Sequence, residues 1–274
     1  MRFLYCGDVV GRSGREAVET YLPDLRKKLD LDFVVVNGEN AASGFGITEK
    51  ICNGFYEVGT DCIVLGNHSF DQREILSYID SDARLIRPIN YPEGTPGRGA
   101  SAFRTRGGKS VLIVQVMGRV FMDPLDDPFA SVDKILKTGR LGQKYDFILV
   151  DIHGEATSEK MAMGHFCDGR VSLVVGSHSH VPTADAQILP GGTAYQTDAG
   201  MCGDYNSVIG MDKEEPVRRF TRKIPGGRFT PALGPGTLCA IYVETDDKTG
   251  LATTVSPVRI GARLQEVTPI ISGI

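Results

Sequence analysis

Several short apolar runs in this sequence are followed at once by side chains that can bind a metal ion. These side chains carry carboxylate, carboxamide or imidazole groups, and none of them is a cysteine. They are Asp8, Glu39, Asn40, Asn67, His68, His153, His178 and His180. The chain has only five histidines, and four of them stand in these positions. Such a concentration indicates one functional site built from distant parts of the chain.

The donor types restrict which ions this site would hold. Oxygen and imidazole ligands without thiolate suit Mn²⁺, Fe²⁺ or Zn²⁺, whereas several imidazoles argue against a pure Mg²⁺ or Ca²⁺ site. At least six candidate ligands exceed what one tetrahedral ion needs. The sequence therefore predicts two divalent cations.

The apolar runs themselves predict the elements that position these donors. Because the runs lack polar alternation, we expect strands buried on both faces, in a largely parallel sheet covered by helices. Ligands bind beyond the carboxyl ends of such strands, so the donors should converge there. The expected strands are Phe3–Cys6, Phe33–Val36, Cys62–Leu65, Val111–Val116, Phe147–Val150, Leu173–Val175, and a pair at Thr237–Thr245 and Thr253–Ile260. The expected helices are Arg15–Leu29, Thr48–Val58, Asp71–Ile79, Phe129–Lys137 and Glu159–Cys167.

Two neighbouring cations have a well-defined chemistry. They lower the pKa of a bridging water and hold the oxygens of an in-line displacement at phosphorus. We therefore predict phosphoester hydrolysis with a metal-bridging hydroxide as nucleophile. Glu39 is the natural bridge, because one carboxylate can give an oxygen to each ion. His68, beside Asn67, is free to protonate the leaving oxygen.

Composition excludes several other classes of protein. The chain has 274 residues, with 30 basic and 34 acidic residues and a net charge of −4, which offers no general attraction to duplex DNA. It contains no apolar run long enough to span a membrane. Its six scattered cysteines form no CxxC pair, which favours a reducing cytoplasm. A homo-oligomer is common among soluble enzymes, but no residue pattern here indicates one.

The order of the motifs resembles that of the calcineurin-like metallophosphoesterases. The segments NGEN, GNH, HGE and GSHSHVPTAD are similar to their YmdB-like branch, and the resemblance runs from Asp8 to about Gly210. It implies an α/β fold, a four-layer metallophosphoesterase sandwich of two mixed β-sheets flanked by helices, forming a single domain over residues 1–274. It also implies a phosphodiesterase acting on 2′,3′-cyclic nucleotides, with iron or manganese favoured and zinc or magnesium as alternatives.

The resemblance also assigns roles to the donors. One ion would bind Asp8, Glu39, Asn40 and His180, and the other Glu39, Asn67, His153 and His178, with His68 as the catalytic residue. Two positions depart from the superfamily pattern. Val10 replaces the usual histidine of the first motif, and Ser69 replaces an acidic residue that would orient His68, for which Asp71 is a substitute.

Some interpretations stay open at this point. A phosphomonoesterase or nuclease would use the same ions, and a regulatory nucleotide- or RNA-binding protein with weak hydrolysis would retain them. The sequence identifies no substrate-binding residue. The basic segment Arg218–Lys223 is interpreted either as a nucleotide clamp or as a solvated surface. Asp198–Asn206 would shape the cleft or form an ordinary loop, and Glu155 would accept a hydrogen bond from a ligating histidine or begin a helix.

Overall fold

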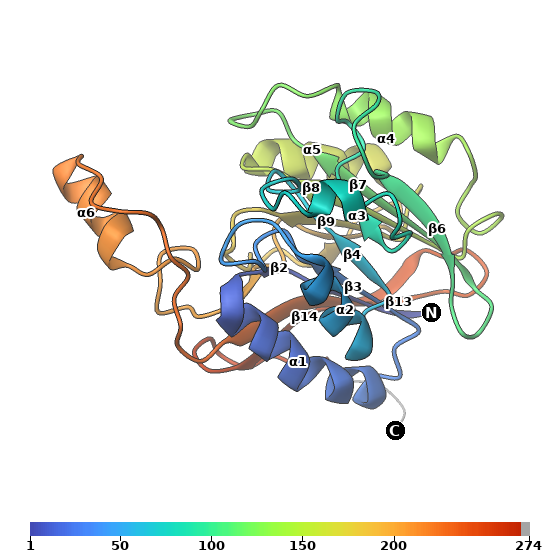
Figure 1. The fold of residues 1–274 in the computed structure, drawn as a ribbon. Coiled ribbons are helices and arrows are strands. Elements are labelled where there is room, and N and C mark those ends of the chain that lie inside the picture. The colour runs from blue at the N-terminus through green and yellow to red at the C-terminus, as the bar shows by residue number, and fades with distance from the viewer. Residues whose placement is uncertain (270–274) are drawn as a thin grey trace.

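Two six-stranded sheets face each other at the centre of this protein, and helices cover their outer faces (Figure 1). The computed structural model describes residues 1–269. In the first sheet the strand order is β14-β13-β1-β3-β4-β5, and β1, β3, β4 and β5 run parallel. Its strands are β1 Arg2–Cys6, β3 Phe33–Asn37, β4 Cys62–Val64, β5 Leu85–Ile86, β13 Thr237–Thr245 and β14 Ala252–Gly261.

The second sheet has the order β10-β11-β9-β8-β7-β6, with a parallel centre of β11, β9, β8 and β7 and an antiparallel strand at each edge. Its strands are β6 Ala100–Arg104, β7 Ser110–Met117, β8 Phe147–His153, β9 Leu173–Ser177, β10 Gln187–Ile188 and β11 Ala194–Gln196. A small parallel pair, β2 Asp8–Val9 and β12 Met201–Cys202, lies beyond the end of β1.

The helices form the two outer layers. The helices α1 Gly11–Lys28 and α2 Glu49–Glu57 pack on the first sheet, and α4 Pro128–Leu136 and α5 Thr157–Cys167 pack on the second. The short α3 Ile75–Tyr78 contributes its buried Ile75 to the core beneath the first sheet. This arrangement confirms the predicted four-layer sandwich of two mixed sheets.

Alternate residues of the central strands supply two different cores, which is why their sequences lack polar positions. In β1, Leu4 packs toward α1, whereas Phe3 and Tyr5 point between the sheets. There the ring of Phe3 stacks on that of Phe147 from β8, with 4.2 Å between centroids. Burial on both faces is the predicted property of these strands.

The antiparallel partner of β1 comes from the far end of the chain. The strand β13 pairs with β1 on the side opposite β3, and the amino terminus of Met1 donates to the carbonyl of Thr245 at 3.0 Å. The predicted pair of strands near residues 237–260 is thus confirmed as β13 and β14.

The expected helices differ from the observed ones by more than two residues in two places. The segment predicted as a helix from Asp71 to Ile79 holds only the single turn of α3, because the Asp71 carboxylate bonds to His68 instead of capping a helix. The helix α1 begins at Gly11, four residues before the predicted start at Arg15.

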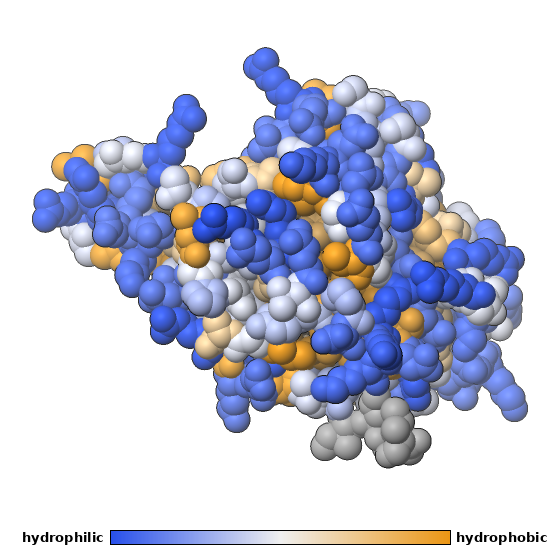
Figure 2. Space-filling view, turned by 60° about the horizontal axis from the view of Figure 1, so that its bottom comes forward, coloured by the Kyte–Doolittle hydropathy of each residue, from blue (hydrophilic) through white to orange (hydrophobic). Residues whose placement is uncertain are grey.

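A sixth helix was not predicted. The helix α6 Glu214–Arg222 contains most of the basic segment and protrudes from the body of the molecule (Figure 1). We call residues 206–235, which contain α6 and its flanking loops, the α6 lobe. In Figure 2 the lobe lies at the left and shows apolar side chains among charged ones.

Two further observations concern membrane-spanning helices and the state of the cysteines. Among residues 1–269, no helix combines the length and apolar character that crossing a membrane requires. All six cysteines are buried as free thiols.

Candidate metal centre

Two groups of side chains that could bind a metal ion lie beside each other where the two sheets meet. The first group is Asp8, Glu39 and His180, and the second is Glu39, His153 and His178. Within each group the ligand atoms lie within 4.8 Å of one another, and Glu39 belongs to both. The structure thus brings together residues that the strand-end pattern placed at one site.

The two sheets contribute different kinds of ligand. The oxygen donors Asp8, Glu39 and Asn67 follow β1, β3 and β4 of the first sheet. The imidazoles come from the second sheet, where His153 ends β8, and His178 and His180 follow β9. A cation bound between them would link the two sheets directly.

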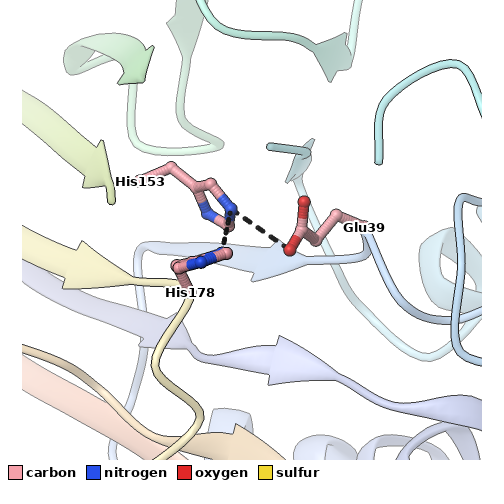
Figure 3. Close-up of side chains that lie close together, drawn as sticks. All are labelled: Glu39, His153 and His178. Carbon is pink, nitrogen blue, oxygen red and sulfur yellow. Dashed lines mark hydrogen bonds and ion pairs between the residues drawn. The ribbon is translucent and has the colours of Figure 1, made fainter. Parts of the chain in front are cut away.

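The Nε2 atom of His153 stands at the centre of this arrangement. It lies 3.2 Å from Glu39 Oε1, 2.9 Å from Asn67 Oδ1 and 3.2 Å from His178 Nδ1 (Figure 3 shows the contacts with Glu39 and His178). A single N–H cannot serve three neighbours, and each neighbour directs lone pairs at the same space. Convergent lone pairs are the arrangement that a cation completes.

Two buried oxygen atoms support the same conclusion. Among the described residues, Asn40 Oδ1 has no hydrogen-bond partner and Glu39 Oε1 has only its ion-pair contact with His153 Nε2, although buried oxygens are costly to leave unpaired. The amide nitrogen of Asn40 donates to the carbonyl of Gly44 at 3.0 Å, which fixes the free oxygen on the opposite side. The chemistry of this donor set therefore fits divalent cations, and Asn40 Oδ1 is free to face one.

Gly66 leaves room for these donors. A Cβ at this position would overlap the Glu39 carboxylate and lie 2.5 Å from His153 Nε2. Only glycine lets the backbone after β4 pass so close to both ligands.

The electrostatics of the cluster centre on His153, for which burial lowers the pKa but Glu39 outweighs it and raises the value to about 9. Burial raises the pKa of Asp8 to about 7, although His180 and His153 act in the opposite direction. Burial also raises the pKa of Glu39, but the neighbouring His153 outweighs it and brings the value down to about 2. His178 has its pKa lowered to about 3 by burial and by His153. It is therefore neutral and offers a lone pair at physiological pH.

Hydrogen bonds behind the imidazoles hold their orientation. His180 Nδ1 donates to the carbonyl of Ile209 at 2.7 Å, which leaves Nε2 toward the cluster. His153 Nδ1 donates to Ser177 Oγ at 2.9 Å, and that hydroxyl donates to Asp151 at 2.7 Å. Tyr5 donates to the same aspartate from the first sheet. Sequence reasoning missed these residues, because only the fold places them behind the ligands.

The loop that carries His178 and His180 is held in an unusual conformation. Their φ angles are +95° and +63°, values that cost energy for residues other than glycine. A fully buried ion pair anchors this loop: Lys160 Nζ lies 2.9 Å from Asp198, and both groups bond to Ser179 between the two histidines. Asp198–Asn206 thus begins with a residue that supports the site.

His68 lies at the edge of the site, with its backbone N–H donating to Glu39 at 3.2 Å. Its Nδ1 is 2.8 Å from Asp71 Oδ2, so Asp71 is the orienting partner that the sequence left open. Glu155 lies 3.5 Å from His178 Nε2 and precedes the N-cap of α5, which favours its interpretation as a partner of a ligating histidine.

Comparison with known proteins identifies the family. The family model for YmdB-like proteins matches residues 4–258. A Bacillus subtilis (strain 168) protein named 2′,3′-cyclic-nucleotide 2′-phosphodiesterase is 45% identical over 260 residues, covering 95% of this chain and 97% of that protein.

Two crystal structures are similar over nearly their whole length. A hypothetical protein from Thermus thermophilus has a TM-score of 0.89 and 44% identity, covering 96% of this chain and 100% of that one. A novel phosphatase from Mycoplasma pneumoniae has a TM-score of 0.88 and 31% identity, covering 95% and 93%. The chain belongs to the YmdB-like family.

Proposed function

We propose that this protein is a dinuclear metal-dependent phosphodiesterase that hydrolyses small phosphodiesters, in particular 2′,3′-cyclic nucleotides. The observation that carries the proposal is the pair of ligand groups that share Glu39. The name of the Bacillus subtilis relative supports the substrate class.

The ligand sets follow from the two groups and the unpaired amide oxygen. We propose that one cation binds Asp8, Glu39, Asn40 and His180. The other binds Glu39 together with the ligands Asn67, His153 and His178. Oxygen and imidazole donors without thiolate favour manganese or iron, with zinc or magnesium as alternatives.

When bound, two such cations activate a water molecule and neutralise charge at the phosphoryl group. The remaining steps fall to the chain's own side chains. Asp71 accepts the Nδ1 proton of His68, so Nε2 is the atom that can give a proton to the leaving ribose oxygen. His68 lines the same cavity as Glu39 and His178, which is the placement that a proton donor needs.

A phosphomonoesterase is the second candidate function, because one structural relative is called a phosphatase. The two activities differ in whether the phosphorus carries one ester bond or two. The donor cluster serves both, so the surrounding cavity decides between them.

The test combines metal analysis with a substrate panel. We expect about two equivalents of manganese or iron per chain in freshly purified protein. Turnover of 2′,3′-cyclic AMP should exceed that of AMP and of a single-stranded oligonucleotide. A chain without stoichiometric metal, or a His153→Ala variant as active as wild type, would refute the proposal. Faster turnover of AMP would instead establish the phosphatase.

Three wider properties are also proposed. Six buried, unpaired thiols suit a reducing compartment, which favours a cytoplasmic location. The sheets share a common core between them, which favours a single domain. The third proposed property is that the protein forms a homo-oligomer, which sedimentation analysis would test.

A further inference from the structure

We infer that the α6 lobe forms a binding subsite for the nucleobase of the substrate, with Phe220 as its stacking surface. The inference rests on the proposed nucleotide phosphodiesterase function and deepens it. It concerns the segment Arg218–Lys223, which the sequence left open between a nucleotide clamp and a solvated surface.

The cavity at the metal centre has two chemically different sides. Its volume is about 420 Å³, which lies within the range of small-molecule sites. Glu39, Asn40, His68, His178 and His180 line one side. The α6 lobe provides the other side, which is apolar and consists of Val208, Ile209, Met211, Pro216, Phe220 and Phe229.

A 2′,3′-cyclic nucleotide has the same division. Its cyclic phosphate is anionic and belongs beside the donor cluster, whereas its base is flat and largely apolar on both faces. When the phosphate lies at the cluster, the base has the apolar side of the same cavity beside it. Outside the lobe, the described cavity lining contains one aromatic side chain besides its histidines, Phe45, which lies next to His68.

Phe220 has the properties expected of a stacking surface. Its side chain is 74% exposed although it lines the cavity, so the fold itself leaves the ring largely uncovered. The guanidinium of Arg219 lies 3.9 Å from the ring centroid of Phe229, whereas the ammonium of Lys223 over the Phe220 ring is farther away, at 5.8 Å. One face of Phe229 is therefore already occupied, and Phe220 is the more accessible ring.

The lobe is held in shape by its own contacts. Arg219 pairs with Glu215 at 2.7 Å within α6 and donates to the carbonyl of Gly227 at 2.6 Å. The N–H of Gly226 donates to Glu215 at 2.8 Å. These bonds tie the helix to the loop that follows it, so Phe220 is presented by an ordered support.

The cavity lining also bears on the two interpretations of the basic segment. Of residues Arg218–Lys223, only Phe220 lines the cavity, while Arg218 and Arg222 line a separate hollow on α6. The segment therefore contributes a ring to the site and not a cationic clamp. Stacking without hydrogen bonds to base edges is tolerant of base identity, so we expect all four nucleotides to be accepted, purines somewhat better.

The test compares a substrate with its analogue that lacks the base. Wild type and Phe220→Ala are assayed on 2′,3′-cyclic AMP and on the 2′,3′-cyclic phosphate of 1-O-methylribose. Stacking on an aromatic ring predicts about a 5- to 50-fold loss of kcat/KM on the nucleotide in the variant, mainly through KM. Activity on the analogue should stay unchanged. Phe220→Trp should preserve nucleotide turnover, and Val217→Ala, on α6 but outside the cavity, is the matched control.

A binding measurement keeps this inference separate from the proposed function. Calorimetry on the metal-free protein should show that adenosine binds, that 1-O-methylribose does not, and that Phe220→Ala weakens adenosine binding at least 5-fold. If the protein binds adenosine in this way but hydrolyses no diester, the subsite stands and the phosphodiesterase proposal fails.

Three results would overturn the subsite. The first is an equal loss of kcat/KM on the nucleotide and on its analogue in Phe220→Ala, and the second is unchanged adenosine binding by that variant. The third is a change in its sedimentation, which would place the ring between two copies of the chain.

Discussion

The donor cluster and the α6 lobe face each other across one cavity and are built in opposite ways. Asp8, Glu39 and His153 are fully buried and come from two sheets, whereas Phe220 is 74% exposed on a single continuous segment. Residues that belong to both sheets cannot be replaced without disturbing the fold. Residues of a single surface segment can be replaced without that effect. Under the two proposals above, the chemistry depends on the core and the choice of substrate depends on the lobe. Changes at the cluster should therefore affect all substrates alike.

The largest effect should follow from Gly66→Ala. The new methyl group would collide with Glu39 and His153, so the ligands must move apart. We expect a loss of at least about 10³-fold in kcat/KM, roughly 4 kcal/mol in transition-state free energy. Hydrolysis of bis(p-nitrophenyl) phosphate in excess Mn²⁺ measures it, and circular dichroism checks the fold.

Gly54→Ala is the control for that variant. Gly54 lies inside α2, and a Cβ there would meet nothing within 4 Å. Activity should be unchanged, and the free energy of unfolding should rise by about 0.5–1 kcal/mol. A fully active Gly66→Ala protein would show that the cluster is not the catalytic centre.

A smaller effect is expected for His68→Ala, which tests whether one residue at the cavity edge acts chemically without holding a cation. We expect kcat to fall by about 10²- to 10³-fold, since proton donation to the leaving oxygen is lost. Metal content, measured by mass spectrometry, should remain at two ions per chain. Loss of metal in this variant would instead make His68 a part of the ligand set.

Ser177→Ala should weaken metal binding without removing a ligand. The hydroxyl links His153 to Asp151, and loss of such a support typically costs about 10- to 100-fold in metal affinity. Calorimetric titration with Mn²⁺ measures the change. The control is Ser172→Ala, a buried serine that accepts from the N–H of Ile148 and should cost only about 1 kcal/mol of unfolding free energy. Equal Mn²⁺ affinity in both variants would contradict the proposed support.

The smallest effect is predicted for Asp71→Asn. The amide oxygen can still accept the proton of His68 Nδ1, so orientation is kept while the negative charge is lost. We expect kcat to fall by about 3- to 10-fold on every diester, with no preference for nucleotides. A loss confined to nucleotide substrates would place Asp71 in base recognition. It would contradict the proposed separation of roles between the donor cluster and the α6 lobe.

The sequence predicted the strand cores and the side chains that follow them, for a physical reason. Parallel strands with uninterrupted β-branched residues must be buried, and their carboxyl ends must lie at a common edge. The convergence of Asp8 with Glu39 follows from that rule, whereas His153 reaches them from the second sheet, which only the family resemblance implied. The family resemblance added the pairing of donors into two ligand sets.

Other features depend on contacts that local patterns do not encode. Asp71 has the spacing of a helix cap, but its carboxylate bonds to an imidazole instead. The support of His153 by Ser177 and Asp151 exists only once β8 and β9 are paired. The helix α6 was missed because its many charges resemble an irregular surface, while its one cavity-facing ring gives no periodic signal.

The position of β1 has a consequence for how the protein is made. Its neighbour β13 follows every proposed ligand in the sequence, so one edge of β1 stays open until residues 237–245 have been synthesised. Asp8 directly follows that strand, and nascent chains that already carry every ligand still lack the partner that fixes it. Metal loading should therefore wait until β13 has been synthesised, and a chain stopped after residue 236 would expose the unpaired edge of β1 and aggregate.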